Sequence, residues 1–367
     1  MGSQCLESKR PVAEGYFLKE LTPIIKGIAI ILMFAVHLLK TKWMTYPEMV
    51  VDFKIGALTL SDILARGGDI CVGMFAFITG YGWSIKGGGE NKLRQSFGVG
   101  SVYWLYWLVL ILFAFPMRIL MALLSGNGFP AISSVEILKS LFALESESVK
   151  FQWYIYFYVL ALFTYPWFNR ATKAIHCGFV MKMIGICLAF LLLRLGLRAL
   201  LECVWPSEDV MSVVSHYGQW MPVVMIGSAV RENEQSIAGR FQKPVFMWAA
   251  PTIYFAKVLF QYMTGLYSGF DSFIIFPFMV GIIELARRIH DCAPILNRVL
   301  SCLGKFSMYM WLTHRIMLFQ PFQRIMSLFR FPVIMLMAAL AIMLPVSMLL
   351  SNIDMRLRTA CLADRAR

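Results

Sequence analysis

Two side chains that could do chemistry stand within one apolar stretch near the amino terminus. Residues 23–39 are mostly Ile, Leu, Ala, Met, Phe and Val, interrupted by a cation, Lys26, and an imidazole, His37. At about 100° per residue, the eleven-residue spacing puts both on one helical face, roughly 16 Å apart along the axis. An imidazole in apolar surroundings suits a general base, and the cation suits phosphates or an acidic neighbour. The same residues also fit a structural role, with Lys26 extending to lipid headgroups and His37 bonding a neighbouring helix.

A second apolar stretch, 70–85, ends in small and hydroxyl-bearing residues and is followed by basic ones. Thr79, Gly80 and Tyr81 lie near its end, and Lys92 and Arg94 come shortly after it. Glycine lets a backbone or a ligand approach closely, so a phosphate-rich cofactor could dock beside this basic segment. Tight helix packing next to an ordinary basic loop explains the same pattern.

Two later stretches add aromatic and polar residues. Trp153 and Tyr154 begin one apolar run, where they could belong to an interfacial aromatic belt or stack on a sugar. In another, Ser307, Trp311 and His314 recur at i, i+4 and i+7, which puts them on one helical stripe. His314 is predicted near the middle of the membrane, at a depth comparable to that of His37, where a polar stripe indicates a site or a satisfied structural histidine.

The composition is that of an integral membrane protein. The 367 residues are 59% hydrophobic and 15% charged, with a mean hydropathy of +0.67 and 24 Met. The net charge of +13 comes from short basic clusters between apolar runs, which suits loops near a membrane and not a nucleic-acid surface. The eight cysteines are scattered without metal-ligand spacing, so we expect no metal and no disulfide framework.

We expect an all-α polytopic bundle of about ten transmembrane helices. The runs lie near 23–39, 70–85, 99–124, 152–168, 178–200, 213–230, 244–266, 272–290, 303–319 and 332–351. Lys and Arg are more numerous in the loops on the side of the amino terminus, which predicts that both termini are cytoplasmic. The chain then divides into a tail (1–22), one membrane domain (23–351) and a second tail (352–367). Lys257 is a further charge within a run, and Glu284 is a possible partner for cations.

Taken in order, these landmarks resemble those of the acyltransferase 3 family. They are Lys26-x10-His37, Phe75-Ala-Phe-Ile-Thr79-Gly80-Tyr81, Trp153-Tyr154 and Ser307-Met-Tyr-Met-Trp311-Leu-Thr-His314. The family consists of bacterial membrane enzymes that acylate surface polysaccharides and other glycans. The resemblance implies about ten helices in the bacterial cytoplasmic (inner) membrane, an acyl-CoA donor, usually acetyl-CoA, and a hydroxyl acceptor. The family more often has Arg at the position of Lys26, Ser at that of Thr79, and Arg-x-x-Arg where this chain has Lys92-x-Arg94.

The resemblance suggests roles for the candidate residues. His37 would take the proton of the attacking hydroxyl or accept the acyl group itself; the sequence leaves both open. Lys26 would assist it by pairing with donor phosphates. Acetyl-CoA would bind near Thr79, Gly80, Tyr81, Lys92 and Arg94. The glycan would bind near Trp153, Tyr154, Ser307, Trp311 and His314. Two other functions remain, a transporter or flippase of lipid-linked glycans and a non-catalytic component of a polysaccharide assembly complex.

Overall fold

The computed structural model describes residues 17–40, 44, 46–85, 92–124, 126, 133–143, 153–204, 208–241, 243–265 and 271–365. In this part the chain is a helical bundle with one small antiparallel hairpin, β1 (Lys54–Ile55) and β2 (Leu58–Thr59). The α-helices are α1 Phe17–Leu39, α2 Leu60–Gly68, α3 Cys71–Ile85, α4 Lys92–Val109, α5 Phe115–Leu124, α6 Ser134–Leu141, α7 Trp153–Ala174, α8 Phe179–Val204, α9 Glu208–Glu232, α10 Glu234–Phe241, α11 Ala249–Thr264, α12 Asp271–Cys292, α13 Pro294–Lys305, α14 Ser307–Thr313, α15 Gln320–Ser327 and α16 Pro332–Arg365. The prediction of an all-α architecture is confirmed for the described residues.

Five helical stretches are long and apolar enough to cross a membrane. They are Lys19–Leu39, Leu60–Ile85, Gly98–Leu124, Phe179–Val204 and Pro332–Ala360. The second of these begins earlier than the sequence predicted, because α2 leads through Asp69 and Ile70 directly into α3. The third contains a π-helical turn, η3 (Leu110–Ala114), between α4 and α5.

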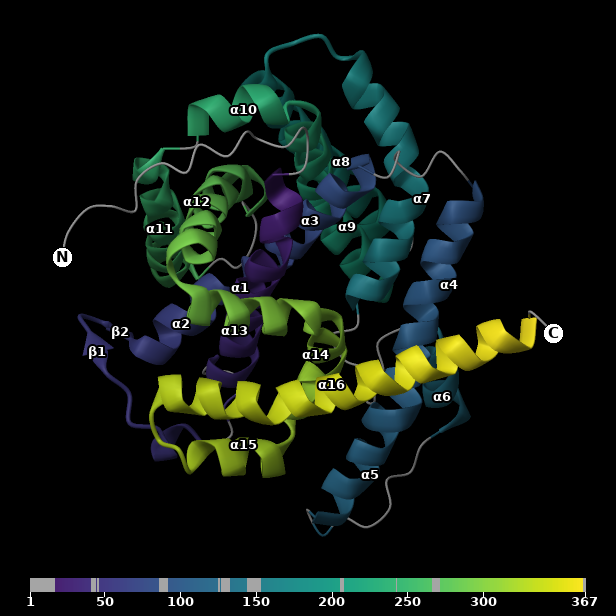
Figure 1. Cartoon of the computed structure of the whole chain (residues 1–367), viewed down its shortest axis with the longest axis vertical. Helices are drawn as coiled ribbons and strands as arrows, with labels where there is room; N and C mark the ends of the chain where they lie inside the picture. The colour runs from purple at the N-terminus through teal and green to yellow at the C-terminus, as the bar shows by residue number, and fades with distance from the viewer. Residues whose placement is uncertain are drawn as a thin grey trace.

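Helix α1 lies in the interior of the bundle. Figure 1 shows it in the middle of the molecule, crossed by α13, whereas α4, α5, α6 and the end of α16 form an outlying arm. Apolar residues occur on several faces of α1, and Ile24, Ile25, Ile30 and Phe34 are fully buried. A helix that is apolar nearly all round is stable only when neighbours cover it, which is why α1 is enclosed.

Glycines bring the neighbours of α1 and α3 unusually close. A Cβ atom on Gly304 would lie 1.8 Å from the carbonyl oxygen of Pro23, so α13 packs backbone to backbone on α1. A Cβ atom on Gly80 would lie 1.8 Å from the carbonyl oxygen of Val224, so α3 packs on α9 in the same way. Only glycine permits such contacts between helices.

The ninth predicted run is not one continuous helix. Helix α13 ends at Lys305, because Phe306 adopts φ −97° and ψ 9°, and the short α14 ends at Thr313. A 3-10 turn, η5 (His314–Leu318), follows. His314 therefore begins a turn and does not continue the helical stripe of Ser307 and Trp311.

The close α3–α9 contact makes a stability prediction. Gly80→Ala is expected to lower the free energy of unfolding by about 1–3 kcal/mol, because the new methyl group forces two backbones apart. The measurement is the midpoint of thermal unfolding of the purified chain in detergent.

Gly196→Ala is the matched control, since a Cβ atom at Gly196 on α8 meets nothing within 4 Å. Equal midpoints for the two variants would contradict the α3–α9 packing.

Candidate functional site

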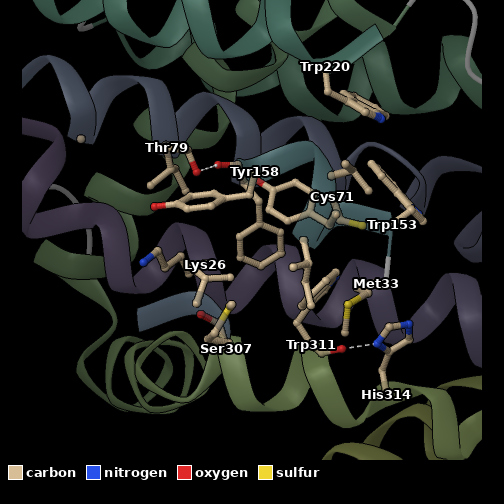
Figure 2. A pocket seen from close by; sticks show the side chains of 18 of the residues that line it. Lys26, Met33, Cys71, Thr79, Trp153, Tyr158, Trp220, Ser307, Trp311 and His314 are labelled. Atoms are coloured by element: carbon tan, nitrogen blue, oxygen red, sulfur yellow. Dashed lines mark hydrogen bonds between the residues drawn. The ribbon is translucent and has the colours of Figure 1, made fainter. Parts of the chain in front are cut away.

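A large cavity lies beside α1. Its volume is about 1100 Å³, at the upper end of small-molecule pockets, and it is lined by α1, α3, α4, α7, α9 and α14. Figure 2 shows Lys26, Thr79 and Ser307 toward one side, and Trp153, Trp220 and His314 toward the other. Of the predicted site residues with described side chains, all but one line this cavity: Lys26, His37, Thr79, Tyr81, Trp153, Tyr154, Ser307, Trp311 and His314.

The remaining predicted residues lie elsewhere or outside the description. Gly80 does not line the cavity, because it faces the backbone of Val224 on α9. Lys92 and Arg94 lie in the first turn of α4, and their side chains are outside the part of the chain that the structure describes.

Two histidines meet in the cavity. The ring centroids of His37 and His314 are 4.4 Å apart, and the rings are tilted by 46°. His314 is 1% exposed and His37 is half-buried. The sequence placed both at similar depth on separate elements, and the fold brings them into contact.

The tautomer of His314 follows from its backbone contact. Its Nδ1 atom is hydrogen-bonded to the carbonyl oxygen of Trp311, drawn as a dashed line in Figure 2. A carbonyl oxygen can only accept, so Nδ1 carries the proton. In the neutral ring the lone pair is then on Nε2.

We call one end of the cavity the Lys26 end. Lys19, Thr22, Lys26, Gly82 and Ser101 line it, from the first turns of α1, the end of α3 and the middle of α4. Its ionisable groups are cationic, since among the described lining residues only Asp69 carries a carboxylate, and Asp69 lies at the other end. Lys26 and His37 line the same cavity, as expected for two residues on one helical face.

We call the opposite end the Asp69 end. Lys40, Asp69, Trp153, His216, Gln219 and Trp220 line it. Lys40 Nζ lies 3.6 Å from Asp69 Oδ2, and both side chains are mostly buried. The Trp153 ring is stacked on His216, with centroids 4.0 Å apart and planes within 11°. This end therefore combines one ion pair, one amide and flat aromatic side chains.

A second ion pair lies next to the Asp69 end, outside the residues that line the cavity. Lys257 Nζ donates to Asp271 Oδ1 at 2.6 Å, and both side chains are 4% exposed. Gln219 Nε2 lies 3.5 Å from the other carboxylate oxygen of Asp271. The intramembrane cation predicted at Lys257 thus has Asp271 as its partner, whereas Glu284 binds Arg287 and Arg288.

The hydroxyl groups predicted near the donor are engaged with protein atoms. Thr79 Oγ1 donates to the carbonyl oxygen of Phe75 at 2.8 Å, and the Tyr81 hydroxyl donates to Glu234 Oε1 at 2.8 Å. Between the two ends, the Tyr154 ring meets Trp311 edge to face at 5.4 Å. The middle of the cavity is consequently walled by aromatic rings.

Sequence analysis missed most of the Asp69 end. Asp69 comes directly before the apolar run 70–85, and His216, Gln219 and Trp220 fall within about one turn of the predicted helix 213–230. A polar side chain next to or inside an apolar run is a signal for function, and this signal was present at Asp69, His216 and Gln219. Within the described residues, no group of three or more side chains could hold a metal ion.

No protein-family model matches the chain, and neither a curated protein nor a solved structure matches it. The function of the site therefore has to be inferred from its own geometry and from the sequence landmarks.

The buried ion pair behind the cavity gives a second prediction. Lys257→Met should destabilise the chain by about 3–5 kcal/mol, because it leaves the Asp271 carboxylate buried without its cation. Adding Asp271→Leu should recover most of this loss, since two apolar side chains then pack where two charges were. Thermal unfolding of the single and double variants in detergent measures both effects, and a double variant as unstable as Lys257→Met contradicts the pairing.

Proposed function

We propose that the protein is a membrane-embedded O-acyltransferase of the acyltransferase 3 type. It moves an acyl group, most simply acetyl from acetyl-CoA, to a hydroxyl of a cell-surface or lipid-linked glycan. The observation that supports this best is the contact between His37 and His314 inside a cavity with cations at one end. This arrangement provides a base and a site for an anionic donor within one enclosure.

In the proposed reaction the acceptor hydroxyl attacks the thioester carbonyl while His37 takes the hydroxyl proton. A C–O bond forms, the C–S bond breaks, and the proton passes from the imidazolium to the departing thiolate of CoA. The His314 ring contacts His37, and in its neutral form it carries an Nε2 lone pair that is proposed to stabilise the positive charge that His37 acquires. Direct acylation of His37 is the alternative mechanism. It would form an acyl-enzyme intermediate at His37 that could be trapped.

The donor is proposed to enter at the Lys26 end. Lys26 and Lys19 attract its phosphates, and the Lys26–His37 spacing of roughly 16 Å gives the pantetheine arm a path along α1 to the base. The basic residues Lys92 and Arg94 follow in α4 and are proposed to hold the nucleotide.

This function places the chain in the cytoplasmic membrane of a bacterium with the Lys26 end toward the cytoplasm. The five apolar stretches would then be joined by α7, α9, α11, α12 and the α13–α14 segment to make ten spans over 23–351. Both termini are proposed to be cytoplasmic.

A transporter of lipid-linked glycans is the second candidate. The cavity is lined from Lys19 on α1 to Lys40 directly after it, a length of about 32 Å that is close to the hydrocarbon core of a bilayer. A path of this length suits translocation as well as the meeting of two substrates from opposite sides.

A transfer assay tests the catalytic role of His37. In membranes supplied with labelled acetyl-CoA, His37→Gln is expected to reduce acetyl incorporation into glycan by 10²- to 10⁴-fold, since the base is lost. His290→Gln is the control, because His290 is exposed on α12, and it should keep wild-type activity.

Unchanged transfer by His37→Gln at matched protein levels would remove His37 from the mechanism. If the wild type transfers nothing while glycan export depends on the protein, the transporter is favoured.

The same assay tests the Lys26 end. Lys26→Ala should raise the KM for acetyl-CoA by about 10-fold or more, which corresponds to the loss of one charge-assisted contact, whereas Lys26→Arg keeps the charge and should stay near wild type. Lys182→Ala near the start of α8 is the control, because Lys182 does not line the cavity. A Lys26→Ala variant with an unchanged KM for acetyl-CoA would show that the donor binds elsewhere.

A further inference from the structure

The Asp69 end differs from the Lys26 end in its charge balance. Lys40 and Asp69 face each other at 3.6 Å, so one positive and one negative group line this end together. Next to them, outside the cavity lining, Lys257 and Asp271 form a second pair of one positive and one negative group. A charged ligand would lie next to one group of opposite charge and one of like charge. Its transfer from water into this site would therefore gain little free energy.

Hydroxyl groups fit this end better than ions do. An alcohol donates one hydrogen bond and accepts others, so it can accept from Lys40 and donate to Asp69 or to the side-chain carbonyl oxygen of Gln219. Gln219 is 6% exposed and lines the cavity, and its Nε2 points toward Asp271. That leaves the Gln219 carbonyl oxygen as an acceptor for a ligand hydroxyl.

Aromatic side chains supply the apolar part of the site. Trp153 lies flat on His216, and Trp220 lines the cavity nearby. His216 Nδ1 is 3.3 Å from the hydroxyls of Tyr156 and Ser212, which fix its ring and with it the Trp153 plane. Rigid aromatic planes beside hydroxyl-binding groups match a sugar ring, which has C–H groups on its faces and hydroxyls on its edge.

We propose that the Asp69 end binds an uncharged sugar ring, with Asp69 and Gln219 selecting neutral sugars over anionic ones. This inference rests on the proposed acyltransferase function and identifies the acceptor part of its site. Lys40 follows His37 by three residues, about 4.5 Å along α1. A ring held by Asp69 and Gln219 therefore presents a hydroxyl to the base.

Direct binding to the whole chain tests the proposal without relying on turnover. The protein is placed in phosphatidylcholine nanodiscs free of sugar detergents, and saturation-transfer NMR is recorded with methyl pyranosides of glucose, galactose, mannose, rhamnose and N-acetylglucosamine. Methyl glucuronide is the anionic probe. At least one neutral glycoside is expected to bind, with at least fivefold higher affinity than the glucuronide.

Two substitutions assign the binding to the Asp69 end. Asp69→Asn and Gln219→Leu are each expected to weaken binding of the neutral glycoside at least fivefold. Gln261→Leu is the matched control, because Gln261 is 2% exposed on α11 and does not line the cavity, and it should bind as the wild type does. Asp69→Asn leaves Lys40 without its carboxylate, so Asp69→Asn with Lys40→Met is measured as well.

The outcomes separate this inference from the proposed function. The sugar site is wrong if no neutral glycoside binds, if the glucuronide binds equally well, or if both substitutions leave binding unchanged, even when acetyl transfer persists. If a neutral glycoside binds in an Asp69-dependent way but the protein neither binds acetyl-CoA nor transfers acetyl, the sugar site stands and the acyltransferase proposal fails.

Discussion

The backbone contact between α1 and α13 positions the whole site. Gly304 lies against the carbonyl oxygen of Pro23, and Gly27 of α1 lies against that of Leu300, so the two helices meet without intervening side chains. Helix α14 follows α13 after the break at Phe306 and contacts α1. Its end then brings His314 to His37. A Cβ atom at either glycine would collide with the facing backbone and force α1 and α13 apart.

The cavity combines two environments along one helix. Its Lys26 end has cations without a described lining carboxylate, and its Asp69 end has balanced charges and flat rings. The histidine pair lies near the Asp69 end, with His314 on the side of Trp153 and Trp220 (Figure 2). A charged molecule at one end and a neutral molecule at the other would therefore not compete for the same groups.

Much of the architecture could be predicted because it depends on local patterns. Apolar run lengths located the helices, and the helical period predicted that Lys26 and His37 line one surface. The break after α13 was not predicted, because no proline or paired glycine marks Phe306. The pairing of Lys40 with Asp69 and of Trp153 with His216 depends on how distant helices pack, and a single sequence does not encode this in its spacing.

The ion pair of Lys257 and Asp271 has a consequence for biogenesis. These residues belong to consecutive helices, α11 and α12, which pack on each other. In the proposed ten-span arrangement both helices cross the membrane. There, a lone lysine or aspartate costs about 2.5–3.5 kcal/mol on entering the centre of a bilayer in a single helix. Paired within a hairpin, the two charges neutralise one another before either meets lipid. Helices α11 and α12 are therefore expected to leave the translocon together, as one unit, and not one after the other.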